Sequence, residues 1–339
     1  MSEKKPENWL WHLFGLLNPI IVIIGNILGG FWTLMGFIFT LILGPIFDVS
    51  FGKGKEIRPP RSSGVPFKIL LWMHVLLHGF VLCSLFWLAW KNGLNIWLVT
   101  ATISTGLHSG ASAIITAHEL GHSRRGSISW KVSRILLFSV NYTHFTTEHN
   151  YNHHKWVATD KDPASAKEGE SIYGFVFRTI PQQYLSAAKI QARKGNIGIN
   201  NPVHRGLSIQ LLVLIILFVI PEDGFKTIGI AWIIQSFVAI FLLEYVNYIR
   251  HYGLRRKENE RLQRSHSWQS EARWSRWTLL ELTRHSHHHM EANKPFWELI
   301  SWDDAPHLPA GYYACFWPCM IPPIWRNWMK KHIPISNIS

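Results

Sequence analysis

Residues 9–47 read WLWHLFGLLNPIIVIIGNILGGFWTLMGFIFTLILGPIF and contain no Lys, Arg, Asp or Glu. An apolar helix needs about 20 residues to cross the hydrocarbon core of a bilayer, so this stretch is long enough for two crossings. Gly25 and the pair Gly29 and Gly30 offer places for the chain to turn. We therefore predict two membrane-spanning helices, over residues 9–27 and 30–47.

Four further stretches share this pattern of long apolar runs with almost no charge. They predict helices over residues 68–90, 94–117, 206–221 and 227–249. The expected fold class is all-α, a polytopic integral membrane protein with six transmembrane helices in a single domain over residues 1–339. Helices buried in a large soluble core are the alternative, but four or more spans of this length argue against it.

The basic residues indicate how the helices are oriented. Of 34 Lys and Arg, only Lys91 and Lys226 lie in the loops near residues 25–30, 91–94 and 221–227. By the positive-inside rule the opposite segments are cytoplasmic, which predicts an inner-membrane protein with both termini in the cytoplasm. No small-residue cleavage site precedes the first apolar run, so we expect that run to be an anchor and not a removed signal.

The net charge of +13 comes from the same segments. Anionic lipid attracts Lys and Arg beside a membrane, and no nucleic-acid-binding motif accompanies them. We therefore expect the lipid bilayer as a partner and no nucleic acid. The basic face is also suited to steering an acidic soluble protein.

Nine histidines form four short groups, each just past or between the apolar stretches. They are His118 and His122; His149, His153 and His154; His251; and His285, His288 and His289. Imidazole is a common ligand of iron, zinc and copper. The grouping predicts a metal centre in a cytoplasmic cap formed by segments 118–205 and 250–339.

The first group, HELGH at residues 118–122, places two rings four residues apart on one face of a helix. The same pentapeptide matches H-E-x-x-H, the signature of zinc metalloproteases, with Glu119 as the general base. An intramembrane zinc protease is therefore a competing hypothesis. A zincin needs only one further ligand, however, and leaves the other histidines unexplained.

The second and third groups have similar spacings. His149, His153 and His154 repeat the i, i+4 spacing and add an adjacent ring, and His285, His288 and His289 lie at i, i+3 and i+4. About eight or nine nitrogens exceed what one zinc binds and suit two metal ions with open positions. The spacing does not choose between zinc, copper and iron. The histidines expected to be ordinary interfacial side chains are His12, His74, His78, His108, His204, His307 and His332.

Only three cysteines occur, Cys83, Cys315 and Cys319. A fused iron–sulfur module for electron transfer needs four cysteines in CxxC-like pairs. Electrons for a redox reaction must therefore come from another protein.

The boxes HxxxH, HxxxHH and HxxHH resemble those of membrane fatty-acid desaturases, sterol and carotenoid hydroxylases, and alkane and xylene monooxygenases. Residues 247–254, NYIRHYGL, are similar to the NYxEHYGL signature of the membrane alkane 1-monooxygenases. Further matching stretches lie at residues 45–48, 148–150, 158–159, 162–166, 169–173, 308–312 and 322–325. The resemblance thus covers most of the chain from about residue 45 onward.

This resemblance implies a non-haem diiron monooxygenase that inserts one oxygen atom from O2 into a terminal C–H bond of an alkane or alkyl chain. It also implies that the nine grouped histidines bind two iron ions (Fe2+/Fe3+), and that electrons come from a rubredoxin and its NAD(P)H-dependent reductase. Hydroxylation of an aromatic methyl group, as in xylene-type enzymes, and desaturation are related alternatives. A hydrocarbon from the bilayer is expected to reach the irons through an apolar channel lined by Phe, Leu, Ile and Trp of the second to fourth helices.

Nine neutral imidazoles leave the charge of two irons uncompensated, so we expect nearby carboxylates to accept hydrogen bonds from the ligand rings. The candidates are Glu119, Glu148, Asp160, Asp162 and Glu244. For Asp160 and Asp162, a solvated surface position is an equal alternative.

The sequence departs from the resembling signatures at three places. Ser123 follows the first box where the family has Lys, His287 stands inside the third box where Asp is common, and Arg250 replaces the Glu of NYxEHYGL. Side chains of neighbouring residues on a helix diverge by about 100°. We therefore expect Arg250 to turn away from the irons and to extend to the headgroups at the cytoplasmic rim. The alternative is that the glutamate of the signature normally helps the metal site, so that this chain has a weakened or altered centre.

Overall fold

The computed structural model describes residues 7–56 and 63–334. Within these ranges every regular element is a helix, and the only strand-like pairings are two isolated bridges, Lys53 with Ala272 and Gln269 with His307. The all-α prediction is confirmed. The first basic residues of the predicted cytoplasmic N-terminus, Lys4 and Lys5, lie outside the described residues.

Six helical segments of the described chain are long and apolar enough to cross a membrane, as predicted. They are Trp9–Leu28, Gly30–Ser50, Val65–Asn92, Ile96–Gly121, Pro202–Val219 and Asp223–His251. Their ends differ from the predicted bounds by up to four residues, because polar residues continue the helical backbone past several of the apolar runs. His118 and His251 consequently lie on the fourth and sixth spans themselves and not in the loops beyond them.

Several spans are composed of more than one helical type. The first is the 3-10 helix η1 (Trp9–Leu16) with α1 (Leu17–Leu28), and the third is α4 (Val65–Asn92). The second contains η2 (Gly30–Leu34), α2 (Met35–Phe37), the π-helix η3 (Ile38–Leu43) and α3 (Gly44–Ser50). The fourth contains α5 (Ile96–His108), the π-helix η4 (Ser109–Ala113) and α6 (Ile114–Gly121), and the last two are α11 (Pro202–Val219) and α12 (Asp223–His251).

Local sequence explains where two of the spans begin and end. The first span ends at Gly29, whose φ of 69° lies in the left-handed region that favours glycine. The fourth begins after Asn95, whose side-chain oxygen accepts hydrogen bonds from the backbone N–H groups of Trp97 and Leu98. Turn residues thus set both boundaries, as the sequence indicated.

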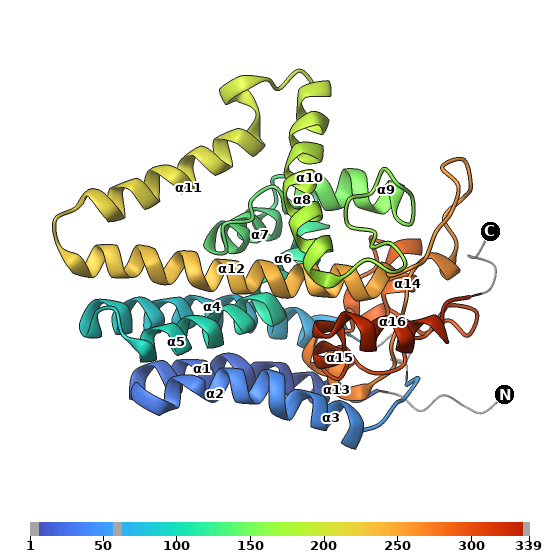
Figure 1. The fold of residues 1–339 in the computed structure, drawn as a ribbon, viewed down its shortest axis with the longest axis horizontal. Coiled ribbons are helices and arrows are strands. Elements are labelled where there is room, and N and C mark those ends of the chain that lie inside the picture. The colour runs from blue at the N-terminus through green and yellow to red at the C-terminus, as the bar shows by residue number, and fades with distance from the viewer. Residues whose placement is uncertain (1–6, 57–62, 335–339) are drawn as a thin grey trace.

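The long helices run side by side, with α12 packed against α4 and α5, and with α1 and α2 on the far side of α5 (Figure 1). Helix α11 diverges from α12, and most of its apolar side chains are exposed. The short helices α13 (Arg273–Thr278), α14 (His285–Met290), α15 (Phe316–Met320) and α16 (Pro322–Lys330) gather at one end of the bundle (Figure 1). We call this the cap end.

The remaining short helices lie in the connections between the longer elements. They are α8 (Phe145–Glu148), the π-helix η5 (His149–His153), α9 (His154–Trp156), and the 3-10 helices η6 (Gly198–Asn200), η7 (Arg264–His266) and η8 (Phe296–Glu298). The longer helix α10 (Ile172–Arg193) stands across the bundle between α9 and α11 (Figure 1).

Helix α7 (Ile128–Ser139) corrects the expectation that segment 118–205 lies wholly beyond the spans. Its last residue, Ser139, makes a hydrogen bond of 2.8 Å to His78 in the middle of α4. The Ser139 carbonyl also accepts from Trp232 and Gln235 on α12. The helix therefore runs back alongside the spans. Its apolar residues are interrupted by Lys131 and Arg134, which hid it from a search for uncharged runs.

Candidate metal centre

The first histidine pair lies at the end of the fourth span. His118 is on α6, and His122 follows its last residue as the C-cap. Their Nε2 atoms are 3.4 Å apart, so both rings face the same point, as the i, i+4 spacing predicted.

The second group departs from the spacing rule. The backbone N–H of His154 donates to the carbonyl of His149, five residues earlier, because η5 is a π-helix. This wider turn brings the rings of His149 and His154 together, with their Nε2 atoms 3.0 Å apart. His153, which the i, i+4 rule paired with His149, belongs to a different cluster.

The third group also divides between two clusters. On α14, His285 and His289 are one turn apart, and their Nε2 atoms approach to 2.8 Å. His288 lies on another face of this helix and contacts His118 and His154. The second and third boxes therefore each supply ligand candidates to both clusters.

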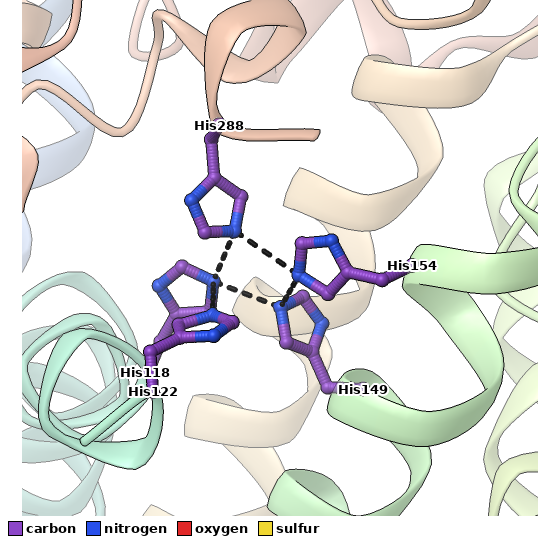
Figure 2. A group of neighbouring side chains, drawn as sticks. All are labelled: His118, His122, His149, His154 and His288. Carbon is purple, nitrogen blue, oxygen red and sulfur yellow. Dashed lines mark hydrogen bonds between the residues drawn. The ribbon is translucent and has the colours of Figure 1, made fainter. Parts of the chain in front are cut away.

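All nine predicted histidines come together in two adjacent clusters. The five-histidine cluster is formed by His118, His122, His149, His154 and His288 (Figure 2). The four-histidine cluster is formed by His153, His251, His285 and His289. In each cluster the candidate ligand nitrogens all lie within 4.8 Å of one another.

The geometry of the five-histidine cluster suits a metal ion. The contacts between Nε2 atoms drawn in Figure 2 range from 2.9 to 3.4 Å. Two nitrogens bound at right angles about 2.1 Å from one ion would be about 3.0 Å apart. The Nε2 of His118 has three such neighbours, but a neutral imidazole carries one N–H and can donate to only one of them. A cation is therefore the group that best stabilises lone pairs facing one centre.

Six of the clustered rings are held in the neutral form that binds metals. Burial lowers the pKa of His122 to about 4. Burial, reinforced by the neighbouring rings, holds the pKa well below its ordinary value in five further members, His149, His154, His285, His288 and His289. At neutral pH these nitrogens offer lone pairs without first losing a proton.

Asp162 is the predicted carboxylate that contacts a clustered ring directly. Its Oδ2 lies 2.9 Å from Nδ1 of His153, which leaves the Nε2 of that ring to face the four-histidine cluster. Ser165 and the backbone N–H of Ala164 donate to the same carboxylate and fix its orientation. A carboxylate in this position fixes the tautomer of the ring and raises its basicity.

Glu119 has a different environment from the one we expected. It is partly buried, and its Oε1 accepts a hydrogen bond of 3.1 Å from the backbone N–H of Phe296 in η8. No hydrogen bond joins it to a ring of either cluster among the described residues. The two histidines of its HELGH motif instead share their centre with three further rings, which does not fit the three-ligand site of a zinc protease.

The other three carboxylates are placed as follows. Glu148 is buried and accepts from Asn152 in η5, and burial followed by the neighbouring Asp162 raises its pKa well above the ordinary value. Glu244 is buried on α12 and accepts from Tyr142, Gln183 and Asn247. Asp160 is 82 % exposed and lies 3.9 Å from Arg255, away from both clusters, so for this residue the surface alternative holds.

Arg250 does not extend to the rim, and that prediction is wrong. The residue is 3 % exposed, and its Nε donates to the hydroxyl of Tyr312 at 3.2 Å. Its charge is, after burial, the largest cause of the lowered pKa of His285. The cap segment around Tyr312 covers the side chain and keeps it from the headgroups.

A buried network of charges holds the third box, and sequence reasoning missed it. Arg284, directly before His285, pairs with Glu271 at 3.1 Å and with Glu281 at 3.4 Å. Arg276 pairs with the same Glu281 at 2.9 Å, and His12 of the first span also contacts this carboxylate, at 3.0 Å. Opposite charges close to a histidine box were the available signal, but their burial depends on tertiary packing.

The remaining histidines lie outside both clusters. His287, inside the third box, points away: its Nδ1 accepts from the backbone N–H of Ile300, and its Nε2 lies 3.1 Å from Glu291. His74 contacts Ser112, His204 contacts Tyr184, and His307 contacts Gln269.

An apolar cavity lies next to the clusters. Its volume is about 30 Å³, and its lining includes Leu41, Ile115, Leu242, Val246, Leu279 and Tyr312. Ile115 lies one helical turn before His118, so the cavity approaches the metal centre from the membrane side. Residues of the second, fourth and sixth spans and tyrosines of the cap line it, and the expected channel along the second to fourth helices stays a prediction.

Comparison with known proteins agrees with this geometry. Residues 94–318 match the family model described as fatty acid desaturase. The chain is 31 % identical to alkane 1-monooxygenase 1 of Pseudomonas aeruginosa, with 98 % of this chain and 92 % of the relative covered. It is also 31 % identical to the alkane 1-monooxygenase of Acinetobacter baylyi, covering 98 % and 86 %. The xylene/toluene monooxygenase hydroxylase component of Pseudomonas putida is 25 % identical over 93 % of this chain and 89 % of the relative. The chain therefore belongs to the alkane 1-monooxygenase family and carries the fatty acid desaturase domain.

Proposed function

We propose that this protein is a membrane-bound non-haem diiron monooxygenase that hydroxylates the terminal methyl group of an alkane or alkyl chain. The observation that carries the proposal is the convergence of nine histidine rings into two adjacent clusters at the membrane end of the cap. The alkane 1-monooxygenases at 31 % identity over 98 % of the chain support the substrate class. The reaction consumes RH, O2, two electrons and two protons and yields ROH and water.

The nine histidines are the proposed ligands of two iron ions, which supply O2 activation when bound. The chain's own residues have three tasks around them. Asp162 holds the tautomer of His153, the pairs around Glu281 hold α14 in place, and the apolar cavity orients the hydrocarbon. A cavity of about 30 Å³ is far smaller than the roughly 300–1,000 Å³ of typical ligand pockets, so side chains must rearrange to admit a chain.

The electrons are proposed to come from a separate rubredoxin reduced by an NAD(P)H-dependent reductase. The three cysteines are free, and two of them, Cys315 and Cys319, are buried. At the cap end the lining of a polar hollow beside η5 includes three basic residues, Lys161, Lys189 and Arg193, and one acidic residue, Asp160. A basic hollow close to the second box suits the docking of an acidic donor. This end is proposed to face the cytoplasm at the inner membrane, with both termini inside.

Product analysis of whole cells given octane, hexadecane and xylene tests the activity. We expect primary alcohols from the alkanes and about two irons per purified chain. The matched control is a His288→Ala variant, which removes a ring of the five-histidine cluster. One zinc per chain, or unchanged activity in the control, would contradict the proposal.

Aromatic methyl hydroxylation is the second candidate. The similarity to the xylene/toluene monooxygenase component favours it, although that relative is less similar than the alkane 1-monooxygenases. Methylbenzyl alcohol as the main product from the mixed substrates would select this alternative.

A further inference from the structure

Arg250 is a buried cation with an incomplete set of partners. Its Nε donates to the hydroxyl of Tyr312, and its Nη2 is buried without a hydrogen-bond partner. No carboxylate lies within ion-pair distance of this guanidinium among residues 7–56 and 63–334. A guanidinium remains protonated in proteins, so an uncompensated positive charge lies inside the cap.

The groups around Arg250 bring no compensating negative charge. It precedes His251 of the four-histidine cluster, whose neutral rings bring no negative charge to a bound cation. The carboxylate that contacts this cluster, Asp162, is directed to His153, Ser165 and the backbone of Ala164. A buried charge that lacks a counter-charge is strongly unfavourable, so an anion bound at the guanidinium would be strongly stabilised.

Tyr312 connects this position with the apolar cavity. Its side chain lines the cavity, while its hydroxyl accepts from Arg250. Among the described residues no acceptor is found for the hydroxyl hydrogen of Tyr312, so this O–H is a second donor beside Nη2. Two donors next to a metal cluster and an apolar cavity match a carboxylate, which accepts at both oxygens.

We propose that Arg250, Tyr312 and the metal ion of the four-histidine cluster together bind a carboxylate anion. The inference rests on the proposed metal centre. Nη2 of Arg250 donates to one carboxylate oxygen, the Tyr312 hydroxyl donates to the same group, and the bound metal contributes positive charge. The bound anion would thus replace the negative charge of the glutamate in the NYxEHYGL signature, the position that Arg250 occupies in this chain.

Titration of the purified full-length protein with Co2+ in a buffer free of carboxylates and halides tests this proposal. Formate should tighten Co2+ binding to the wild type by about tenfold, as one charge-assisted contact predicts. Arg250→Gln should still bind Co2+ but lose the effect of formate. Arg250→Glu should bind Co2+ tightly without formate, because its own carboxylate supplies the charge.

Arg255→Gln is the matched control, because Arg255 faces Asp160 outside the clusters and should leave the formate effect unchanged. Octanoate acting at lower concentration than formate would identify an alkyl carboxylate that also fills the cavity, and the reverse order would identify a small free carboxylate. Co2+ binding that ignores formate in the wild type, or responds equally in Arg250→Gln, would overturn the carboxylate site. Failure of the wild type to bind Co2+ at all would instead overturn the metal centre.

Discussion

Asp160 and Asp162 are two residues apart, yet their side chains have opposite environments. Asp162 is buried and contacts Nδ1 of His153 at 2.9 Å, whereas Asp160 is 82 % exposed. The chain turns between them, where the backbone N–H of Asp162 donates to the carbonyl of Thr159 at 3.2 Å, and Ser165 and the backbone N–H of Ala164 hold the Asp162 carboxylate inside. The spacing of the two residues alone could not predict which of them reaches the metal centre.

Asp162→Asn should therefore weaken the four-histidine cluster, because the amide cannot fix or polarise the His153 ring as a carboxylate does. Loss of such a partner typically lowers metal affinity or activity by about 10–100-fold. Iron content by elemental analysis and turnover of octane are the measurements. Asp160→Asn, the exposed neighbour, should leave both unchanged, and equal losses in the two variants would contradict this role.

Glu119→Gln should lower activity without abolishing it, because glutamine keeps the side-chain oxygen that accepts from Phe296. In a zinc protease the same change would remove the general base and abolish activity while metal remained bound. We expect turnover to fall by no more than about 10–100-fold relative to the wild type, which is the usual effect of changing a residue outside the ligand set. A variant that is fully iron-loaded and inactive would show that Glu119 acts in the chemistry.

Among the helices, the apolar runs predicted all six spans, because an apolar run of about 20 residues is by itself long enough to cross the hydrocarbon core. The histidine boxes predicted which residues gather, but not how they divide. The π-helix η5 pairs His149 with His154 and sends His153 to the other cluster, and no spacing rule based on 3.6 residues per turn predicts this. Helix α7 and the burial of Arg250 likewise depend on tertiary contacts that a periodic pattern does not contain.

Deletion of Tyr151 tests the importance of this π-helix. Removing one residue should convert η5 to an α-helix and rotate His149 by about 100° relative to His153 and His154. We expect the five-histidine cluster to lose its metal ion, while the four-histidine cluster keeps part of its metal occupancy. Tyr151 is half exposed, so Tyr151→Ala keeps the backbone count and should retain both metals. Two metals in the deletion variant would contradict the proposed register.

At the scale of the whole molecule, the buried histidines couple folding of the metal-free protein to pH. The pKa of His122 is about 4 in the folded state against an ordinary value of 6.5. Below pH 6.5 the unfolded chain takes up a proton that the folded chain excludes. Stability is therefore fully present above pH 6.5 and falls as the pH drops toward 4, by roughly 3 kcal/mol for this one ring.

We expect the Tm of the metal-free protein in detergent to fall steadily between pH 6.5 and 5, with several buried rings contributing. His122→Gln removes one of these groups and should flatten the decline. His332, whose side chain lies in the exposed end of the cap, provides the control in His332→Gln. A Tm that stays constant over this range in the wild type would contradict the burial of neutral rings.

The last prediction concerns the docking of the electron donor on the basic surface of the cap. If an acidic rubredoxin binds the basic hollow beside η5, then Lys189→Glu combined with Arg193→Glu places negative charge where the donor approaches. The KM for rubredoxin should rise by about tenfold at low salt, and the difference from the wild type should shrink as salt screens the charges. Lys226→Glu, at the start of α12 and thus at the opposite end of that helix from His251, should leave the KM unchanged. Turnover that is independent of salt in the wild type, or equal KM values in all three proteins, would place the donor on another surface, because an electrostatic encounter at this hollow requires both responses.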